Sequence, residues 1–214
     1  MTLRGLAALA IALAPAGWAS PASGPNPAPA EAALAPADLK VDAAADLKRD
    51  ELIQDLEALI PRMPETDRKA DLYFQLGELW WEKARFASSE EIKEYDQAWG
   101  RWSGSRTGPE PTTDTQRSDG HRKKALQIYQ LVLDRYPGYE RRDEVLFVAA
   151  HNLYDSGSKE EGIARYGALI QQYPRSRFVP DAYVQLGEHF FAANDLARAR
   201  AAFEKAASYR LPKL

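Results

Sequence analysis

One stretch of this sequence repeats at a fixed offset of 37 residues, and this constrains the fold more than any other feature. The small residues Ala125, Gly162 and Ala199 lie 37 residues apart, and an aromatic residue follows each of them four positions later. These aromatic residues are Tyr129, Tyr166 and Phe203. A period of about 20 to 50 residues is typical of repeat proteins, in which each unit buries its apolar face against the next. The sequence therefore predicts a stack of units with a long exposed surface.

Two further features divide each unit into a pair of helices. The segment that begins at Asp71 (DLYFQLGELWW) closely matches the segment that begins at Asp181 (DAYVQLGEHFF), and Pro137 and Pro174 keep the 37-residue step. Proline ends a helix because it lacks an amide hydrogen and its ring clashes with the preceding turn. We therefore expect a first helix with a small residue where the helices approach closely, and a second helix that ends at the proline. The small residues of the first helices are Gly77, Ala150 and Gly187.

This order of residue types resembles the tetratricopeptide repeat, whose signature runs aromatic, Leu-Gly, aromatic, then Ala, aromatic and Pro. The last unit carries the clearest match, at Tyr183, Leu186, Gly187, Phe190, Ala199, Phe203 and Pro212. The resemblance covers residues 67–212. It implies an all-α fold, a right-handed α-solenoid of stacked helical hairpins. Helical periodicity that starts after Asp42 predicts one leading helix in front of them.

The first unit is longer than the others. We place the repeat domain at 43–214, with units at about 67–137, 143–174 and 180–212. Gly77 and Ala125 are 48 residues apart, whereas the equivalent residues of the other units are 12 apart, so 36 residues are inserted within 82–120. The insertion is predicted to continue the first helix as far as Trp102. It then enters a loop rich in Ser, Thr, Gly and Pro over 103–120.

The helical part of the insertion carries a stripe of apolar residues. Its members recur at heptad-like spacing and are Ile92, Tyr95, Trp99 and Trp102. Two interpretations are open. The stripe folds back on the second helix of its own hairpin, or it projects as a docking arm for a partner helix.

The N-terminus has the three-part pattern of a secretory signal peptide over residues 1–19. Arg4 is followed by the apolar run LAALAIAL and by small residues before a cleavage point after Ala19. The apolar run is too short for a transmembrane span. Residues 20–42 form a linker rich in Pro and Ala. Because the chain has no cysteine, it offers no site for lipid attachment, and we expect a free periplasmic protein.

Composition excludes several classes of function. The net charge of −3 does not suit a nucleic-acid-binding protein, which needs an excess of Lys and Arg against phosphates. The three histidines are far apart in sequence and fit no metal-binding motif, and no phosphate-binding loop or nucleophile motif is present. We therefore expect no catalytic residues, no metal and no cofactor.

The resemblance implies a peptide-binding groove lined by the first helix of each unit. Its positions are Asp71, Phe74, Glu78 and Trp81 in the first unit, Glu144, Phe147, His151 and Tyr154 in the second, and Asp181, Val184, Glu188 and Phe191 in the third. Each set starts with an acid and ends with an aromatic residue. This predicts a protein or peptide partner with basic and apolar side chains. The alternative is that the aromatic residues only pack between helices.

The end of the repeat suggests a further contact. No capping helix follows Phe203, so another repeat or a partner is expected to cover that end. The segment Tyr173–Gly187 is similar to periplasmic tetratricopeptide proteins of outer-membrane assembly and of the Tol-Pal accessory type. The predicted helix over Leu72–Trp81, the long insertion and the segment HRKKAL that begins at His121 together also resemble repeat proteins of adventurous gliding motility in deltaproteobacteria. These resemblances imply a scaffold in an envelope complex. The alternative function is a peptidoglycan-associated binding or hydrolytic module.

Overall fold

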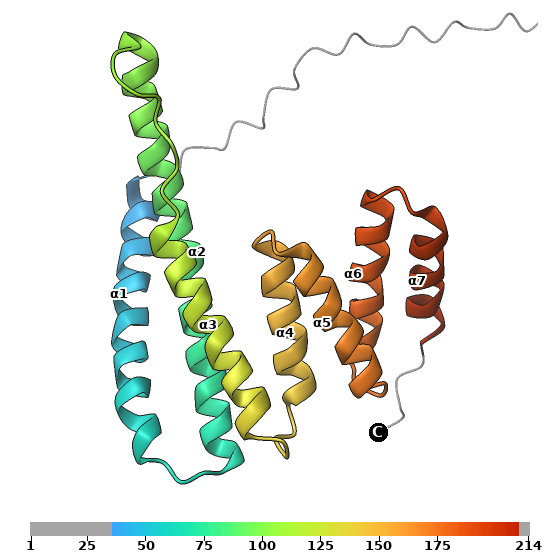
Figure 1. Ribbon diagram of the computed structural model, residues 1–214. Helices are drawn as coiled ribbons and strands as arrows, with labels where there is room; N and C mark the ends of the chain where they lie inside the picture. The colour runs from blue at the N-terminus through green and yellow to red at the C-terminus, as the bar shows by residue number, and fades with distance from the viewer. Residues whose placement is uncertain (1–35, 210–214) are drawn as a thin grey trace, which may run out of the picture. The chain divides into compact units, whose positions relative to one another are not determined.

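The computed structural model describes residues 36–209 of the chain, which fold into helices joined by short turns and by one longer loop over 106–115 (Figure 1). The α-helices are α1 (Pro36–Leu59), α2 (Asp67–Ser105), α3 (Gln116–Arg135), α4 (Arg142–Asp155), α5 (Lys159–Gln172), α6 (Val179–Ala192) and α7 (Leu196–Ser208). A short 3-10 helix, Ile60–Arg62, follows α1. No strand occurs within residues 36–209, so the predicted all-α class is confirmed. The predicted signal peptide and linker residues 20–35 lie outside the described residues.

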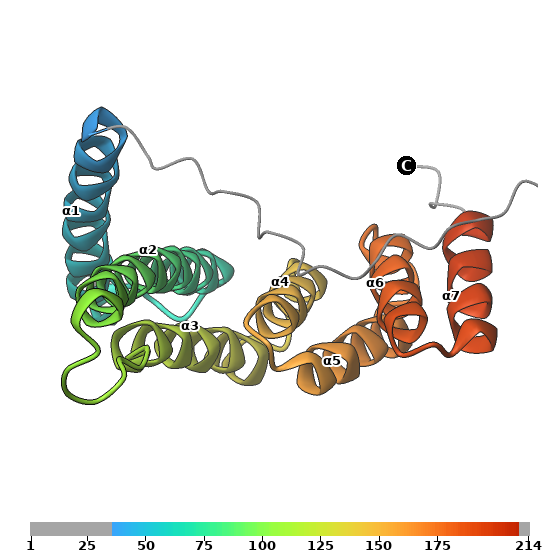
Figure 2. The same cartoon turned by 90° about the horizontal axis from the view of Figure 1, so that it is seen from above.

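The helices pack mainly against their neighbours in sequence. The closest pairs are α2 with α3, α4 with α5, and α6 with α7, and each pair runs antiparallel (Figure 1). The pairs are connected through contacts of α3 with α4 and of α5 with α6, and α1 packs against α2 (Figure 2). Each pair is a helical hairpin, as the internal repeat predicts. None of the helices in residues 36–209 is both long and apolar enough to cross a bilayer.

The sequence repeat is matched by a repeat of backbone hydrogen bonds at the junctions between hairpins. The bonds around the turn from α3 to α4 recur, 37 residues later, around the turn from α5 to α6. The pairs, with the N–H donor first, are Tyr136–Val132 and Tyr173–Leu169, Tyr139–Tyr136 and Ser176–Tyr173, Arg142–Tyr139 and Val179–Ser176, and Val145–Arg141 and Ala182–Phe178. The two junctions therefore have the same backbone conformation, which fixes how each hairpin follows the one before it.

Within the hairpins, one aromatic ring packs onto one small residue of the facing helix. A Cβ atom added to Gly77 would lie 2.5 Å from the Tyr129 ring, and one added to Gly187 would lie 2.5 Å from the Phe203 ring. In the middle hairpin the glycine lies on the second helix instead of the first: Gly162 of α5 packs directly on the backbone of α4. The small residues are needed because the helices approach too closely for a larger side chain.

The element boundaries differ from the prediction in two places. Helix α1 begins at Pro36, earlier than expected, and the loop of the insertion is shorter than expected. Helix α2 continues to Ser105, where Arg106 adopts a left-handed conformation (φ 49°), and α3 already begins at Gln116. The early start of α3 is stabilised from α2, because the buried carboxylate of Glu91 accepts a hydrogen bond from the Ser118 N–H at 3.0 Å.

Candidate binding cleft between α2 and α4

A cleft of about 580 Å³ lies between the first helices of the first two hairpins, α2 and α4. It is lined by Glu78, Trp81, Glu82 and Arg85 from α2, by Val148, His151, Asn152 and Asp155 from α4, and by Arg122 and Ser156. Three of the predicted groove residues, Glu78, Trp81 and His151, therefore meet in one cavity. Glu82, Arg85, Val148 and Asp155 lie one turn away from these residues on the same helix faces, whereas Arg122 comes from α3 and Ser156 from the turn after α4.

Glu78 is the best-defined group in the cleft. The Tyr129 hydroxyl donates a hydrogen bond to Glu78 Oε1 at 2.8 Å, and Asn152 Nδ2 lies 3.3 Å from that hydroxyl oxygen and donates to it. Burial raises the pKa of the Tyr129 hydroxyl, so it stays protonated and keeps donating. Burial also raises the pKa of Glu78, and the nearby charges of Glu82 and Glu144 add to this effect, although the Tyr129 bond opposes it. A half-buried carboxylate of this kind gains from an incoming cation.

The remaining charges of the cleft have mixed signs. His151 Nε2 lies 3.3 Å from Asp155, Arg122 pairs with Asp119 outside the cleft at 2.6 Å, and Glu82 lies 3.3 Å from Arg49 of α1. Arg85 is exposed and also lines the cleft. The cleft is therefore less acidic than the sequence suggested, and its negative charge is concentrated at the Glu78 and Glu82 end of α2.

Two of the acids at the first groove position already have partners within the chain. Arg141 lies 3.2 Å from Asp71 and 2.9 Å from Glu144, and Arg177 lies 3.5 Å from Glu144. The hydrogen bond from Arg141 is the main reason that the pKa of Glu144 is lowered. Tyr139 adds a hydrogen bond to Asp71. These ion pairs connect α2 and α4 to the turns between hairpins. Sequence reasoning placed both acids in the groove but did not find their arginine partners in the connecting turns.

The aromatic residues of the groove positions have different roles. Phe74 is buried in the core, in edge contact with Tyr129. Phe147 stacks on Phe178, with ring centroids 4.9 Å apart, and Tyr154 contacts His189 edge-on. Phe147 and Tyr154 therefore join the second hairpin to the third. Trp81 differs, because it is only partly buried and lines the cleft.

The predicted groove does not continue as a single cavity onto α6. Val184 is partly buried, and Asp181 and Glu188 are exposed on the surface of that helix. Phe191 is 64% exposed and lines a separate hollow on α6 and α7. The structure thus brings together Glu78, Trp81 and His151. The other five groove residues of the first two hairpins and all four of the third do not line the cleft.

The apolar stripe of the insertion stays largely at the surface. Ile92 and Trp99 are exposed, and the rings of Tyr95, Trp99 and Trp102 form a chain with centroid spacings of 6.1 and 5.2 Å. Trp102 donates its indole N–H to the Gly108 carbonyl, which ties the loop to the helix. The residues of this part of α2 that are buried are Ala84, Ala87 and Glu91. Two of these residues are alanines because α2 and α3 pack closely, and Glu91 hydrogen-bonds to α3. The stripe therefore occupies a neighbouring face of α2.

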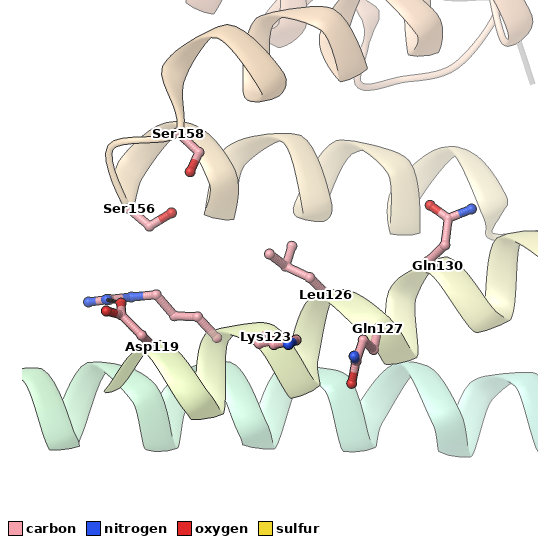
Figure 3. Close-up of a pocket in the computed structure, with 8 residues that line it drawn as sticks. Asp119, Lys123, Leu126, Gln127, Gln130, Ser156 and Ser158 are labelled. Carbon is pink, nitrogen blue, oxygen red and sulfur yellow. Dashed lines mark hydrogen bonds and ion pairs between the residues drawn. The ribbon is translucent and has the colours of Figure 1, made fainter. Parts of the chain in front are cut away.

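A second hollow, of about 420 Å³, lies between α3 and the turn from α4 to α5 (Figure 3). Figure 3 shows that its α3 side is built from successive turns of one helix, with Leu126 between the polar residues Lys123 and Gln130, and that Ser156 and Ser158 face it from the turn. Sequence reasoning did not find this hollow, because its lining belongs to the second helix of the first hairpin. It offers one apolar side chain and scattered polar groups, so it has less to hold a ligand than the α2–α4 cleft.

The α2–α4 cleft offers an indole surface, a half-buried carboxylate and several hydrogen-bonding groups, which suits the binding of a side chain or a short segment. Within residues 43–209, no group of three His, Asp or Glu side chains is arranged to hold a metal ion. No family model, no curated protein and no solved structure matches this chain.

Proposed function

We propose that this chain is a non-enzymatic interaction protein that binds a segment of a partner protein in the α2–α4 cleft. The observation that carries the proposal is that Glu78, Trp81 and His151, three of the groove positions that the resemblance implies, line one cavity. The indole of Trp81 provides the apolar contact that most often dominates an interface. Glu78 provides a charge that a Lys or Arg of the partner neutralises, and this fixes the register of the bound segment.

The proposal extends to the architecture and the place of action. The recurring junctions and the aromatic-on-glycine contacts support a tetratricopeptide-like, right-handed solenoid of hairpins. The three-part pattern of residues 1–19 supports export to the bacterial periplasm, where the protein is a scaffold within an envelope complex such as the gliding motility machinery. The partner segment carries basic and apolar side chains.

Selection from a random peptide library, followed by affinity measurement, tests the binding proposal. The immobilised protein should enrich peptides with a Lys or Arg next to an aromatic or aliphatic residue. For a labelled peptide of the enriched sequence, Trp81→Ala should weaken binding by more than about tenfold, and Glu78→Gln should weaken it by a smaller factor. Trp99→Ala is the matched control, because Trp99 lies outside the cleft and its loss should leave the affinity unchanged.

Two results would contradict the proposal. One is a library selection without enrichment of basic residues. The other is an enriched peptide that binds Trp81→Ala as tightly as the unchanged protein, which would place the binding site elsewhere.

A further inference from the structure

The two ends of the α2–α4 cleft carry opposite charges. Glu78 and Arg85 both line the cleft, and they are separated by two turns of α2. Residues at this spacing lie on the same face of a helix, with about 10 Å between them along the helix axis. Trp81 lies between them on that face and also lines the cleft. The α2 wall therefore presents a carboxylate, an indole and a guanidinium group in that order.

Helix α3 adds a second arginine at the Arg85 end of the cleft. Two contacts fix the antiparallel register of α3 against α2, namely Tyr129 on Gly77 and the Ser118 N–H on Glu91. Both contacts place Arg122 of α3 at the level of Arg85 of α2. Arg122 lines the same cleft. Two guanidinium groups therefore face this end of the cleft, one from each helix of the first hairpin.

The acids near these arginines leave room for a further carboxylate. Glu82 lies between Glu78 and Arg85 on α2, but it pairs with Arg49 of α1 at 3.3 Å. Asp119 pairs with Arg122 at 2.6 Å from outside the cleft. A guanidinium group has several N–H donors, so Arg122 can bind a second carboxylate beside Asp119. Arg85 is exposed and can turn toward the same ligand.

We propose that Arg85 and Arg122 form a subsite for an Asp or Glu side chain of the bound segment, about three residues away from its Lys or Arg. This assignment rests on the proposed binding of a partner segment in the cleft. An extended chain advances about 3.3 to 3.6 Å per residue, so three residues span the distance from Glu78 to Arg85. An apolar residue between the two charges then lies on Trp81. The opposite charges fix the direction of the segment, because the reversed segment would bring like charges together.

Selection from a random peptide library on the immobilised full chain tests the subsite. The enriched peptides should carry Asp or Glu three residues from a Lys or Arg, with an aromatic or aliphatic residue between them. One enriched peptide is then synthesised with both ends blocked, together with a copy in which Asn or Gln replaces the acid. The copy should bind about tenfold more weakly, because it cannot pair with the two arginines.

Variants of the two arginines show whether this preference arises at their end of the cleft. Arg85→Gln alone should reduce the tenfold preference for the acidic peptide to about threefold, and Arg85→Gln/Arg122→Gln should remove it. Arg101→Gln is the matched control, because Arg101 is an exposed arginine of α2 that does not line the cleft. It should keep the full preference. Circular dichroism of each variant shows that the helices are retained.

The carboxylate subsite and the binding proposal fail in different ways. Enrichment of basic and apolar residues without an acid at this spacing would overturn the subsite alone. So would a tenfold preference that survives in Arg85→Gln/Arg122→Gln. A selection without enrichment of basic residues, or an enriched peptide that binds Trp81→Ala as tightly as the unchanged protein, would overturn both.

Discussion

The first and the last hairpins share one contact, an aromatic ring packed on a glycine, but the ring is buried in the first hairpin and exposed in the last. In the first, Tyr129 packs on Gly77 under α4, and its hydroxyl has two partners, Glu78 and Asn152. In the last, Phe203 packs on Gly187 and remains 38% exposed. A buried tyrosine needs hydrogen-bond partners for its hydroxyl; Glu78 of the same hairpin accepts from the Tyr129 hydroxyl, and Asn152 of the next hairpin donates to it. Where no hairpin follows among residues 36–209, the residue is phenylalanine. The difference shows that the Tyr129 side of the first hairpin is covered by the next hairpin, whereas the Phe203 side of the last hairpin is exposed.

The largest expected effect comes from removing each ring. Tyr129→Ala should lower the free energy of unfolding by about 4 kcal/mol, because it leaves a cavity in a closed core. Phe203→Ala should cost about 2 kcal/mol or less, because water already reaches that ring. Chemical denaturation of both variants measures the difference. Equal losses in the free energy of unfolding would mean that the two rings are equally buried.

The second largest difference between the two hairpins should come from adding a methyl group to the glycine that faces each ring. Gly77→Ala places a Cβ atom against the enclosed Tyr129 ring, and we expect a loss of about 2 kcal/mol. Gly187→Ala meets a ring that is free to turn toward solvent, and alanine favours a helix by about 1 kcal/mol. Its net effect on the free energy of unfolding should be near zero. A large loss at Gly187 would show that Phe203 is held as firmly as Tyr129.

The hydroxyl group provides a smaller and more specific comparison. Tyr129→Phe should destabilise the fold by about 1 kcal/mol, because the half-buried Glu78 loses its donor. The reverse change, Phe203→Tyr, should leave the free energy of unfolding unchanged, because water can solvate the new hydroxyl. Thermal unfolding of the two variants checks both values. A stabilising Tyr129→Phe would show that the Glu78 contact is not a favourable one.

The smallest effect concerns the acid at the junction of the first two hairpins. The pKa of Glu144 is held below its ordinary value of 4.5 in the folded protein, mainly by its hydrogen bond from Arg141. Glu144 therefore stabilises the fold above pH 4.5, and this contribution disappears as the pH falls through the lowered pKa. It should be less than about 1 kcal/mol, because Arg141 is half exposed. Denaturation midpoints of Glu144→Gln and the unchanged protein should converge in acid; a constant gap would contradict this assignment.

The repeat, the hairpins and the contact positions could be predicted because small and aromatic residues at fixed spacing follow directly from close helix packing. Two features could not. The pairing of Asp71 and Glu144 with Arg141 depends on where the turns bring an arginine in space, and helix periodicity carries no such information. The stripe that includes Trp99 was placed on the right helix, but the buried face next to it consists of two alanines and the carboxylate residue Glu91. Apolar spacing alone does not show which of two adjacent faces the partner helix covers.

Hydrogen–deuterium exchange with and without the selected basic peptide tests the central claim most directly. Binding in the α2–α4 cleft should slow exchange in the turns of α2 around Glu78 and Trp81 and in the second half of α4 around His151. Exchange in α7 and at the tip of α2 around Trp99 should not change. Protection that appears on α7 or at that tip, with α2 and α4 unaffected near the cleft, would contradict the account.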